Sequence, residues 1–280
     1  MDSLVTPTWL AEHLGDPAVR PVDVRWSLTA RRSGHGEYLA GHIPGAVYLD
    51  IDDDLAAPAF QGPGRHPIPA PEQFAAAARR AGIGPETLVV AYDASGGAYA
   101  ARLWWLLRYF GHTRVALLDG GWSAWQAGGH PIETGEPAVQ PAVFTPRPRP
   151  ELAVDAAAVD ALRQDPTALV IDARAAERYE GQTEPIDKRA GHIPGARNLH
   201  FARNLHPDGS FKSPDELRAQ YKALGADTAA RVVCYCGSGV TAAHNLFALH
   251  LAGRDDALLY EGSWSDWSSD PDRPAATGQE

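Results

Sequence analysis

Cys236 is the residue whose surroundings most strongly indicate a chemical role. It follows the apolar run 231–235, which predicts a buried strand, and precedes the loop Gly237-Ser238-Gly239-Val240-Thr241. A helix is expected directly after this loop. The two glycines let the backbone turn tightly, so that several N–H groups can point at one atom. Together with the positive end of the helix dipole, they would stabilise a thiolate, the nucleophilic form of cysteine.

The chain holds one other cysteine, Cys234, which lies inside the predicted strand. A free cysteine is most often a small core residue, and we expect this for Cys234. The strand, glycine-rich turn and helix around Cys236 favour a reactive thiol there instead. A metal site built on the two cysteines is disfavoured, because no further cysteine and no nearby histidine pair has ligand spacing.

The elements that must position Cys236 occur twice along the chain. The segment 41–46, Gly-His-Ile-Pro-Gly-Ala, recurs letter for letter at 191–196, an offset of 191 − 41 = 150 residues. Segment 82–93 aligns with segment 225–236, and the Trp-containing segment 117–125 aligns with 259–267. Three matches in the same order indicate two copies of one domain. The tryptophans of the third pair, Trp122, Trp125, Trp264 and Trp267, are expected to be packing residues, because the copy without a cysteine carries them too.

Each copy alternates predicted strands and helices, which indicates an α/β fold. We expect two tandem domains, each a parallel sheet with helices on both faces and ligands at the carboxyl ends of the strands. The N-terminal domain is predicted over 1–135, a proline-rich extended linker over 136–151, and the C-terminal catalytic domain over 152–280. The expected helices are Pro71–Arg80, Tyr99–Tyr109, Val154–Arg163, Pro214–Leu224 and Ala242–Leu251, and the expected strands include Leu88–Tyr92 and Val232–Tyr235.

The N-terminal copy serves as an internal control. Asp93 stands at the position of Cys236. A carboxylate offers no nucleophilic sulfur, so this copy is expected to be catalytically silent and to serve as a wall of the site.

Composition excludes several classes of function. The net charge is −10, with 35 acidic against 25 basic side chains, which argues against sequence-independent binding of nucleic acid. No stretch approaches the roughly 18 apolar residues of a membrane helix, and the N-terminus has no signal pattern. Two cysteines make no disulfide framework. We expect a soluble cytoplasmic protein.

These residues together resemble the two-domain rhodanese-like sulfurtransferases over nearly the whole chain. The loop 236–241 looks like that of 3-mercaptopyruvate sulfurtransferases, and the doubled Gly-His-Ile-Pro-Gly motif and the terminal Gly-Ser-Trp-x-x-Trp are family marks. The resemblance implies that the Cys236 thiolate takes sulfur from a donor as a persulfide. A thiol such as thioredoxin, or cyanide, then accepts it. It implies no metal or organic cofactor, and a doubled domain in one chain makes a monomer the expectation.

The resemblance also implies roles for individual residues. The loop 237–241 would hold the persulfide, and its neutral side chains favour 3-mercaptopyruvate over thiosulfate as donor. Arg178 matches a family arginine that contacts the donor carboxylate, and Arg189 is assigned as the second contact, with Lys188 as the other option. His42 matches a family histidine that works in proton transfer with the loop serine, here Ser238, which can also donate to the departing enolate or support the loop.

Three alternatives remain open at this stage. A thiosulfate:cyanide sulfurtransferase would use the same fold and cysteine. A non-catalytic sulfur carrier would accept one sulfur without turnover. A phosphatase of related fold needs an arginine six positions after the cysteine, where this chain has Ala242.

Overall fold

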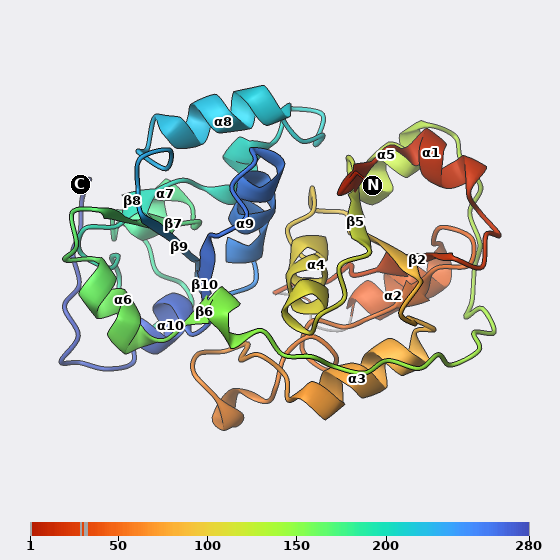
Figure 1. Ribbon diagram of the computed structural model, residues 1–280, viewed down its shortest axis with the longest axis horizontal. Helices are drawn as coiled ribbons and strands as arrows, with labels where there is room; N and C mark the ends of the chain where they lie inside the picture. The colour runs from red at the N-terminus through yellow and green to blue at the C-terminus, as the bar shows by residue number, and fades with distance from the viewer. Residues whose placement is uncertain (1, 29, 31–32, 280) are drawn as a thin grey trace. The chain divides into compact units, whose positions relative to one another are not determined.

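Two five-stranded parallel sheets organise the chain (Figure 1). The computed structural model describes residues 2–28, 30 and 33–279. All neighbouring strands in both sheets are parallel, which confirms the predicted α/β fold. The first sheet has the order β1-β5-β4-β2-β3 and is formed by β1 (Leu4–Val5), β2 (Val19–Asp23), β3 (Val47–Tyr48), β4 (Leu88–Tyr92) and β5 (Val115–Leu118). The second has the equivalent order β6-β10-β9-β7-β8 and is formed by β6 (Ala153–Val154), β7 (Ala168–Asp172), β8 (Arg197–Asn198), β9 (Arg231–Tyr235) and β10 (Leu258–Tyr260).

The helices are short, and three of those described begin at a side-chain N-cap. Ser213 and Glu216 form a capping box at the start of α8, with Pro214 in the first turn. Asp155 caps α6, so that helix begins two residues later than predicted and Val154 joins β6. The α-helices are α1 (Pro7–Glu12), α2 (Ser33–Ala40), α3 (Pro71–Arg80), α4 (Ala100–Tyr109), α5 (Gly121–Ala127), α6 (Ala156–Leu162), α7 (Ala176–Tyr179), α8 (Pro214–Lys222), α9 (Ala242–Leu251) and α10 (Ser263–Trp267), and 3-10 turns occur at Ala59–Gln61, Pro150–Leu152 and Phe201–Asn204.

Both sheets bury alternate residues on opposite faces. In the first sheet, Val90 and Tyr92 of β4 join a core cluster with Trp122 and Trp125, while the intervening Ala91 is buried on the face that α4 covers. The second sheet repeats this arrangement with residues Val233, Tyr235, Trp264 and Trp267. These four tryptophans are at most 8% exposed, which confirms that they are packing residues.

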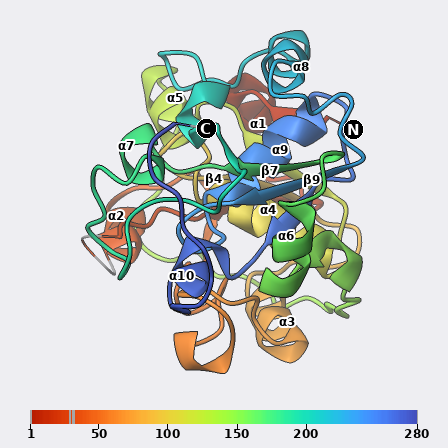
Figure 2. The same ribbon diagram turned by 90° about the vertical axis from the view of Figure 1, so that its left-hand side faces the viewer.

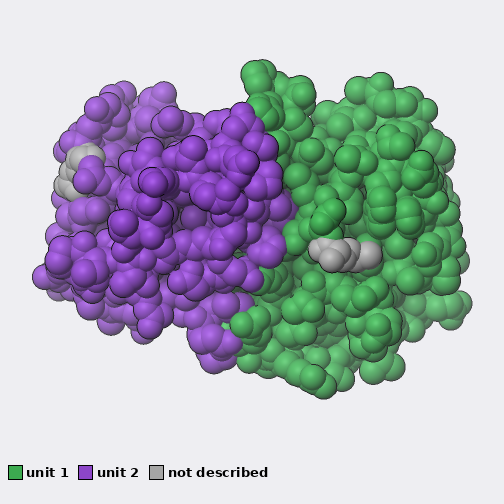
Figure 3. Space-filling model, turned by 45° about the horizontal axis from the view of Figure 1, so that its top comes forward, with its two compact units in different colours: residues 1–57, 69–149, 205–211 green, residues 58–68, 150–204, 212–280 purple. Residues whose placement is uncertain are grey.

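The chain divides into two compact units, which Figure 3 colours separately. Unit 1 contains residues 1–57, 69–149 and 205–211, and unit 2 contains residues 58–68, 150–204 and 212–280. Each unit therefore includes a short segment from the other half of the sequence, since residues 58–68 belong to unit 2 and residues 205–211 to unit 1. A single continuous range of residues does not describe such a unit.

The predicted linker is extended, but most of it packs within unit 1. The Arg147 and Arg149 N–H groups donate to the carbonyls of Phe110 and Tyr109, and Phe144 is buried. Within the described ranges, no helix has the length and apolar character needed to cross a membrane.

Candidate active site

Cys236 directly follows β9, a strand inside the second sheet that pairs with β7 and β10. Figure 2 shows β9 beside β7. The loop after it requires glycine at Gly239, where φ is +77° and a Cβ would lie 2.6 Å from the Glu261 carbonyl oxygen. Cys236 is 2% exposed. Cys234 is fully buried, and burial raises its pKa well above the ordinary value, so it stays a thiol in the core, as predicted.

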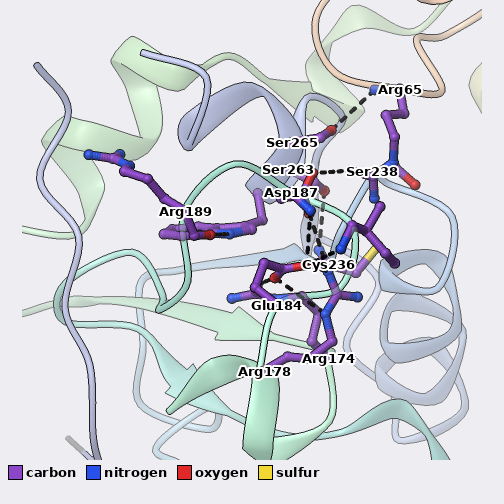
Figure 4. Close-up of polar contacts among 12 residues, drawn as sticks. Arg65, Arg174, Arg178, Glu184, Asp187, Arg189, Cys236, Ser238, Ser263 and Ser265 are labelled. Atoms are coloured by element: carbon purple, nitrogen blue, oxygen red, sulfur yellow. Dashed lines mark hydrogen bonds and ion pairs between the residues drawn. The ribbon is translucent and has the colours of Figure 1, made fainter. Parts of the chain in front are cut away.

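The start of α10 holds the cysteine loop through three hydrogen bonds. The Cys236 N–H donates to Ser263 Oγ at 3.1 Å, and the Trp264 N–H donates to the Cys236 carbonyl at 2.9 Å. The Ser265 N–H donates to the Gly237 carbonyl at 2.9 Å. Both peptide groups that flank Cys236 are therefore held by hydrogen bonds, and Figure 4 shows Cys236 beside Ser263.

A histidine that the sequence analysis did not single out contacts the loop serine. His66 Nδ1 lies 2.7 Å from Ser238 Oγ, and the two residues are 4% and 7% exposed. His66 belongs to segment 58–68 of unit 2, and the neighbouring Arg65 N–H donates to Ser265 Oγ at 3.1 Å. Its setting, Gly-Pro-Gly-Arg-His-Pro, has no periodicity and is typical of a surface loop. In the sequence, only the adjacent chemistry-bearing side chains of Arg65 and His66 could have indicated a role for this loop.

Two guanidinium groups lie beside the residue that follows Cys236. A Cβ on Gly237 would lie 3.0 Å from Arg65 Nη2 and 3.6 Å from Arg178 Nη1. Arg178 was predicted to be a substrate contact, and the structure brings it to the cysteine loop. Arg65 was not predicted. The side chains of loop 237–241 are neutral, whereas Arg65 and Arg178 place two cationic groups beside Gly237.

Three acidic side chains pair with these arginines and with Arg174. Asp187 forms ion pairs with both Arg65 and Arg178. Glu184 pairs with Arg178 at 2.7 Å and with Arg174 at 3.3 Å, and Arg174 also binds Asp172 at 2.7 Å. The result is a continuous chain of alternating charges that ends at the cysteine loop (Figure 4).

Arg189 is not brought together with this cluster. Its Nη1 donates to the Arg273 carbonyl at 2.9 Å, and Figure 4 shows its side chain directed away from Cys236. Its own carbonyl accepts from Trp264 Nε1 at 2.9 Å. Lys188, the other option, is exposed. The second guanidinium beside Gly237 is that of Arg65.

His42 lies in unit 1 and makes contacts that its copy repeats. Its Nδ1 lies 2.8 Å from the Tyr38 carbonyl, and its ring stacks on Tyr38 at 4.2 Å. His192 Nδ1 likewise lies 2.8 Å from the Tyr179 carbonyl, with ring stacking at 3.7 Å. Equivalent contacts in both units indicate a structural role for this motif. A part for His42 in proton transfer stays a prediction.

Asp93 shows what this type of loop can hold. Its Oδ1 accepts from the N–H groups of Ser95 and Gly97 at 2.7 and 2.9 Å, and its Oδ2 from those of Tyr99 and Ala100 at 2.7 and 2.8 Å. The Asp93 carbonyl accepts from the Trp122 N–H at 2.8 Å, as the Cys236 carbonyl accepts from the Trp264 N–H in unit 2. A buried anion is thus bound by four backbone N–H groups in the copy without a cysteine. With the offset 236 − 93 = 143, the equivalent positions in unit 2 are Ser238, Val240, Ala242 and Ala243.

Comparisons with known proteins find similar proteins over nearly the whole chain. The model of the Rhodanese-like domain matches residues 6–128 and 155–270. A probable 3-mercaptopyruvate sulfurtransferase of Pseudomonas aeruginosa is 45% identical over 278 residues, covering 98% of each chain. The thiosulfate sulfurtransferase of Bos taurus is 36% identical, covering 95% of this chain and 91% of its own.

One solved structure extends the comparison to the fold. The crystal structure of SseA from Escherichia coli, described as a 3-mercaptopyruvate sulfotransferase, superposes with a TM-score of 0.84 at 36% identity. The match covers 95% of this chain and 100% of that one.

Proposed function

Because this chain belongs to the rhodanese-like family, we propose that it is a sulfurtransferase that carries sulfur as a persulfide on Cys236, with 3-mercaptopyruvate as the donor. The observation that carries the proposal is the pair of matched loops. In unit 1 the loop binds a carboxylate through four N–H groups, and in unit 2 the same position holds a cysteine. An anionic sulfur on Cys236 would be stabilised in the same way by N–H groups of its loop other than that of Ala243, which donates to the Val240 carbonyl.

The reaction would proceed in two steps. The Cys236 thiolate attacks the donor's thiol sulfur, an S–S bond forms, and the C–S bond breaks with its electron pair moving to carbon. The resulting pyruvate enolate takes up a proton, and the thiol proton of the donor must leave. Ser238 and His66, 2.7 Å apart, form a pair suited to move these protons. An acceptor thiolate or cyanide then attacks the outer sulfur, the S–S bond breaks, and the Cys236 thiolate returns.

The donor's carboxylate fits the two arginines beside Gly237. A guanidinium group binds a carboxylate through paired hydrogen bonds, and Arg178 and Arg65 lie within 4 Å of a Cβ position on Gly237. We retain Arg178 as the donor contact and propose Arg65 as the second one.

Thiosulfate is the second candidate donor. Thiosulfate would contact the same two arginines, and full-length relatives carry the name thiosulfate sulfurtransferase. Comparing kcat/KM for the two donors with cyanide as the acceptor separates them. A higher kcat/KM for 3-mercaptopyruvate is expected, and a strong preference for thiosulfate would overturn the donor assignment.

Two other classes receive less support. A phosphatase would need a phosphate-binding arginine six residues after the cysteine, and Ala242 stands there. A carrier without turnover would take up one sulfur per chain and then stop. An assay that shows repeated release of pyruvate in the presence of a thiol acceptor would exclude the carrier.

The cellular setting is part of the proposal. We propose a cytoplasmic monomer that passes sulfur to a thiol such as thioredoxin, or to cyanide, and that binds neither nucleic acid nor membrane. Both cysteines are free thiols, which suits a reducing compartment, and the net charge of −10 disfavours a nucleic-acid partner.

A further inference from the structure

The two arginines beside Gly237 share one counter-ion. Asp187 Oδ1 pairs with Arg65 Nη1, and Asp187 Oδ2 lies 3.2 Å from Arg178 Nη2. The Asp187 side chain is 5% exposed, while those of Arg65 and Arg178 are 24% and 19% exposed. The carboxylate is therefore buried between two partly accessible cations.

The charges of this cluster balance. Three arginines, Arg65, Arg174 and Arg178, face three carboxylates, Asp172, Glu184 and Asp187. Two of the carboxylates also accept hydrogen bonds from backbone N–H groups. Asp172 accepts from the Arg174 N–H, and Glu184 accepts from the N–H groups of Ile186 and Asp187. The side-chain contacts of Asp187 are with the two arginines of the site.

Glu184 and Asp187 lie in a segment that unit 1 lacks. The histidine of the repeated motif follows its stacking tyrosine by 42 − 38 = 4 residues in unit 1 and by 192 − 179 = 13 residues in unit 2. The nine additional residues contain Glu184 and Asp187. The unit that carries the cysteine is thus the one that carries this counter-ion.

We propose that Asp187 is a specificity-determining residue, which balances the charge of Arg65 and Arg178 so that the site favours a donor with a single carboxylate over doubly charged thiosulfate. This inference rests on the proposed function and deepens it. The negative charge of Asp187 repels a doubly charged donor about twice as strongly as a singly charged one, and a cluster with one excess positive charge would attract the doubly charged donor more.

Burial also affects the ionisation of Asp187. Burial raises the pKa of the Asp187 carboxyl more than the Arg65 guanidinium lowers it, so the ionised form is less favourable in the folded protein than in water.

Asp187→Asn tests the proposal, because it removes the charge and nearly preserves the shape. We expect kcat/KM for thiosulfate, divided by kcat/KM for 3-mercaptopyruvate, to rise about tenfold. Asp187→Glu keeps the charge and should keep the ratio near that of the unmodified protein. Asp160→Asn, at an exposed carboxylate that pairs with Arg163, changes the net charge equally and should leave the ratio unchanged.

Equal losses for both donors in Asp187→Asn, with an unchanged ratio, would show a purely structural role and overturn the proposal. Should that variant fail to fold, Arg65→Gln provides the complementary test, since removing a cation should lower the same ratio, and an unchanged ratio would again overturn the proposal. Failure of the proposed function itself looks different. In that case neither donor would load sulfur on Cys236 in the unmodified protein.

Discussion

Ser263 Oγ accepts a hydrogen bond from the Cys236 N–H at 3.1 Å, and Ser263 has a φ of +53°. Throughout the part of the chain that the structure describes, it is the one non-glycine residue with a positive φ. Gly121 occupies the equivalent place in unit 1, with a φ of +55°. The left-handed conformation costs a side chain about 1–2 kcal/mol, so the cysteine-bearing unit keeps a strained serine where glycine would be relaxed.

Replacing this serine should separate activity from stability. In Ser263→Gly, relief of strain offsets the lost hydrogen bond, so the free energy of unfolding should stay within about 1 kcal/mol of the original. Sulfur transfer should fall about tenfold, because the Cys236 peptide group loses its partner. Ser263→Ala also loses the hydroxyl but keeps the strain, and should be about 1 kcal/mol less stable than Ser263→Gly. Full activity in either variant would contradict this positioning role.

His66 should matter for one donor more than for the other. Departure of pyruvate enolate calls for a proton, whereas sulfite leaves thiosulfate as a stable anion. His66→Ala should therefore lower kcat/KM for 3-mercaptopyruvate about 100-fold and change that for thiosulfate much less. His35→Ala, at an exposed histidine, is the control and should change neither value. Equal losses for both donors would indicate that His66 only supports the loop.

Asp93 should be a strong stabiliser of unit 1. Asp93→Ala leaves four N–H groups, two of them buried, without their acceptor and should lower the free energy of unfolding by about 3 kcal/mol or more, measured by urea unfolding. Asp93→Asn keeps one oxygen acceptor and should cost less. An alanine variant as stable as the original protein would contradict the account of these loops as anion-binding structures.

Donor selectivity should depend on pH through Asp187. Because the pKa of its carboxyl is raised by burial, the group takes up a proton at a pH above the ordinary 3.8. As the pH falls from neutral into that range, the carboxylate loses its charge, and the kcat/KM ratio of thiosulfate to 3-mercaptopyruvate should rise. Glu184 also faces the arginines, so Asp187→Asn is the necessary comparison. The same pH response in both proteins would rule out Asp187 as its source.

The repeat and the periodic segments made much of the architecture predictable. The helices α3 and α9 and the strand β4 lie at the predicted residues, because their apolar patterns coincide with proline, glycine and strand–turn boundaries. The position of Cys236 followed from the same pattern.

What escaped prediction has a physical reason. His66 and Arg65 reach the site through a proline- and glycine-rich segment whose place depends on tertiary contacts with Ser238, Ser265 and Asp187. The orientation of Arg189 depends on the C-terminal segment at Arg273, and no local pattern encodes it. Comparing the spacing of the two histidine motifs could have pointed to the additional segment with Glu184 and Asp187.

Mass spectrometry of donor-treated protein tests the central claim most directly. After incubation with 3-mercaptopyruvate and no acceptor, the peptide containing Cys236 should gain the mass of one sulfur atom, and a thiol or cyanide should then remove it. Cys236→Ser should gain none, since buried Cys234 stays a thiol. Treated protein with no added sulfur on Cys236, or sulfur transfer that persists in Cys236→Ser, would contradict the account.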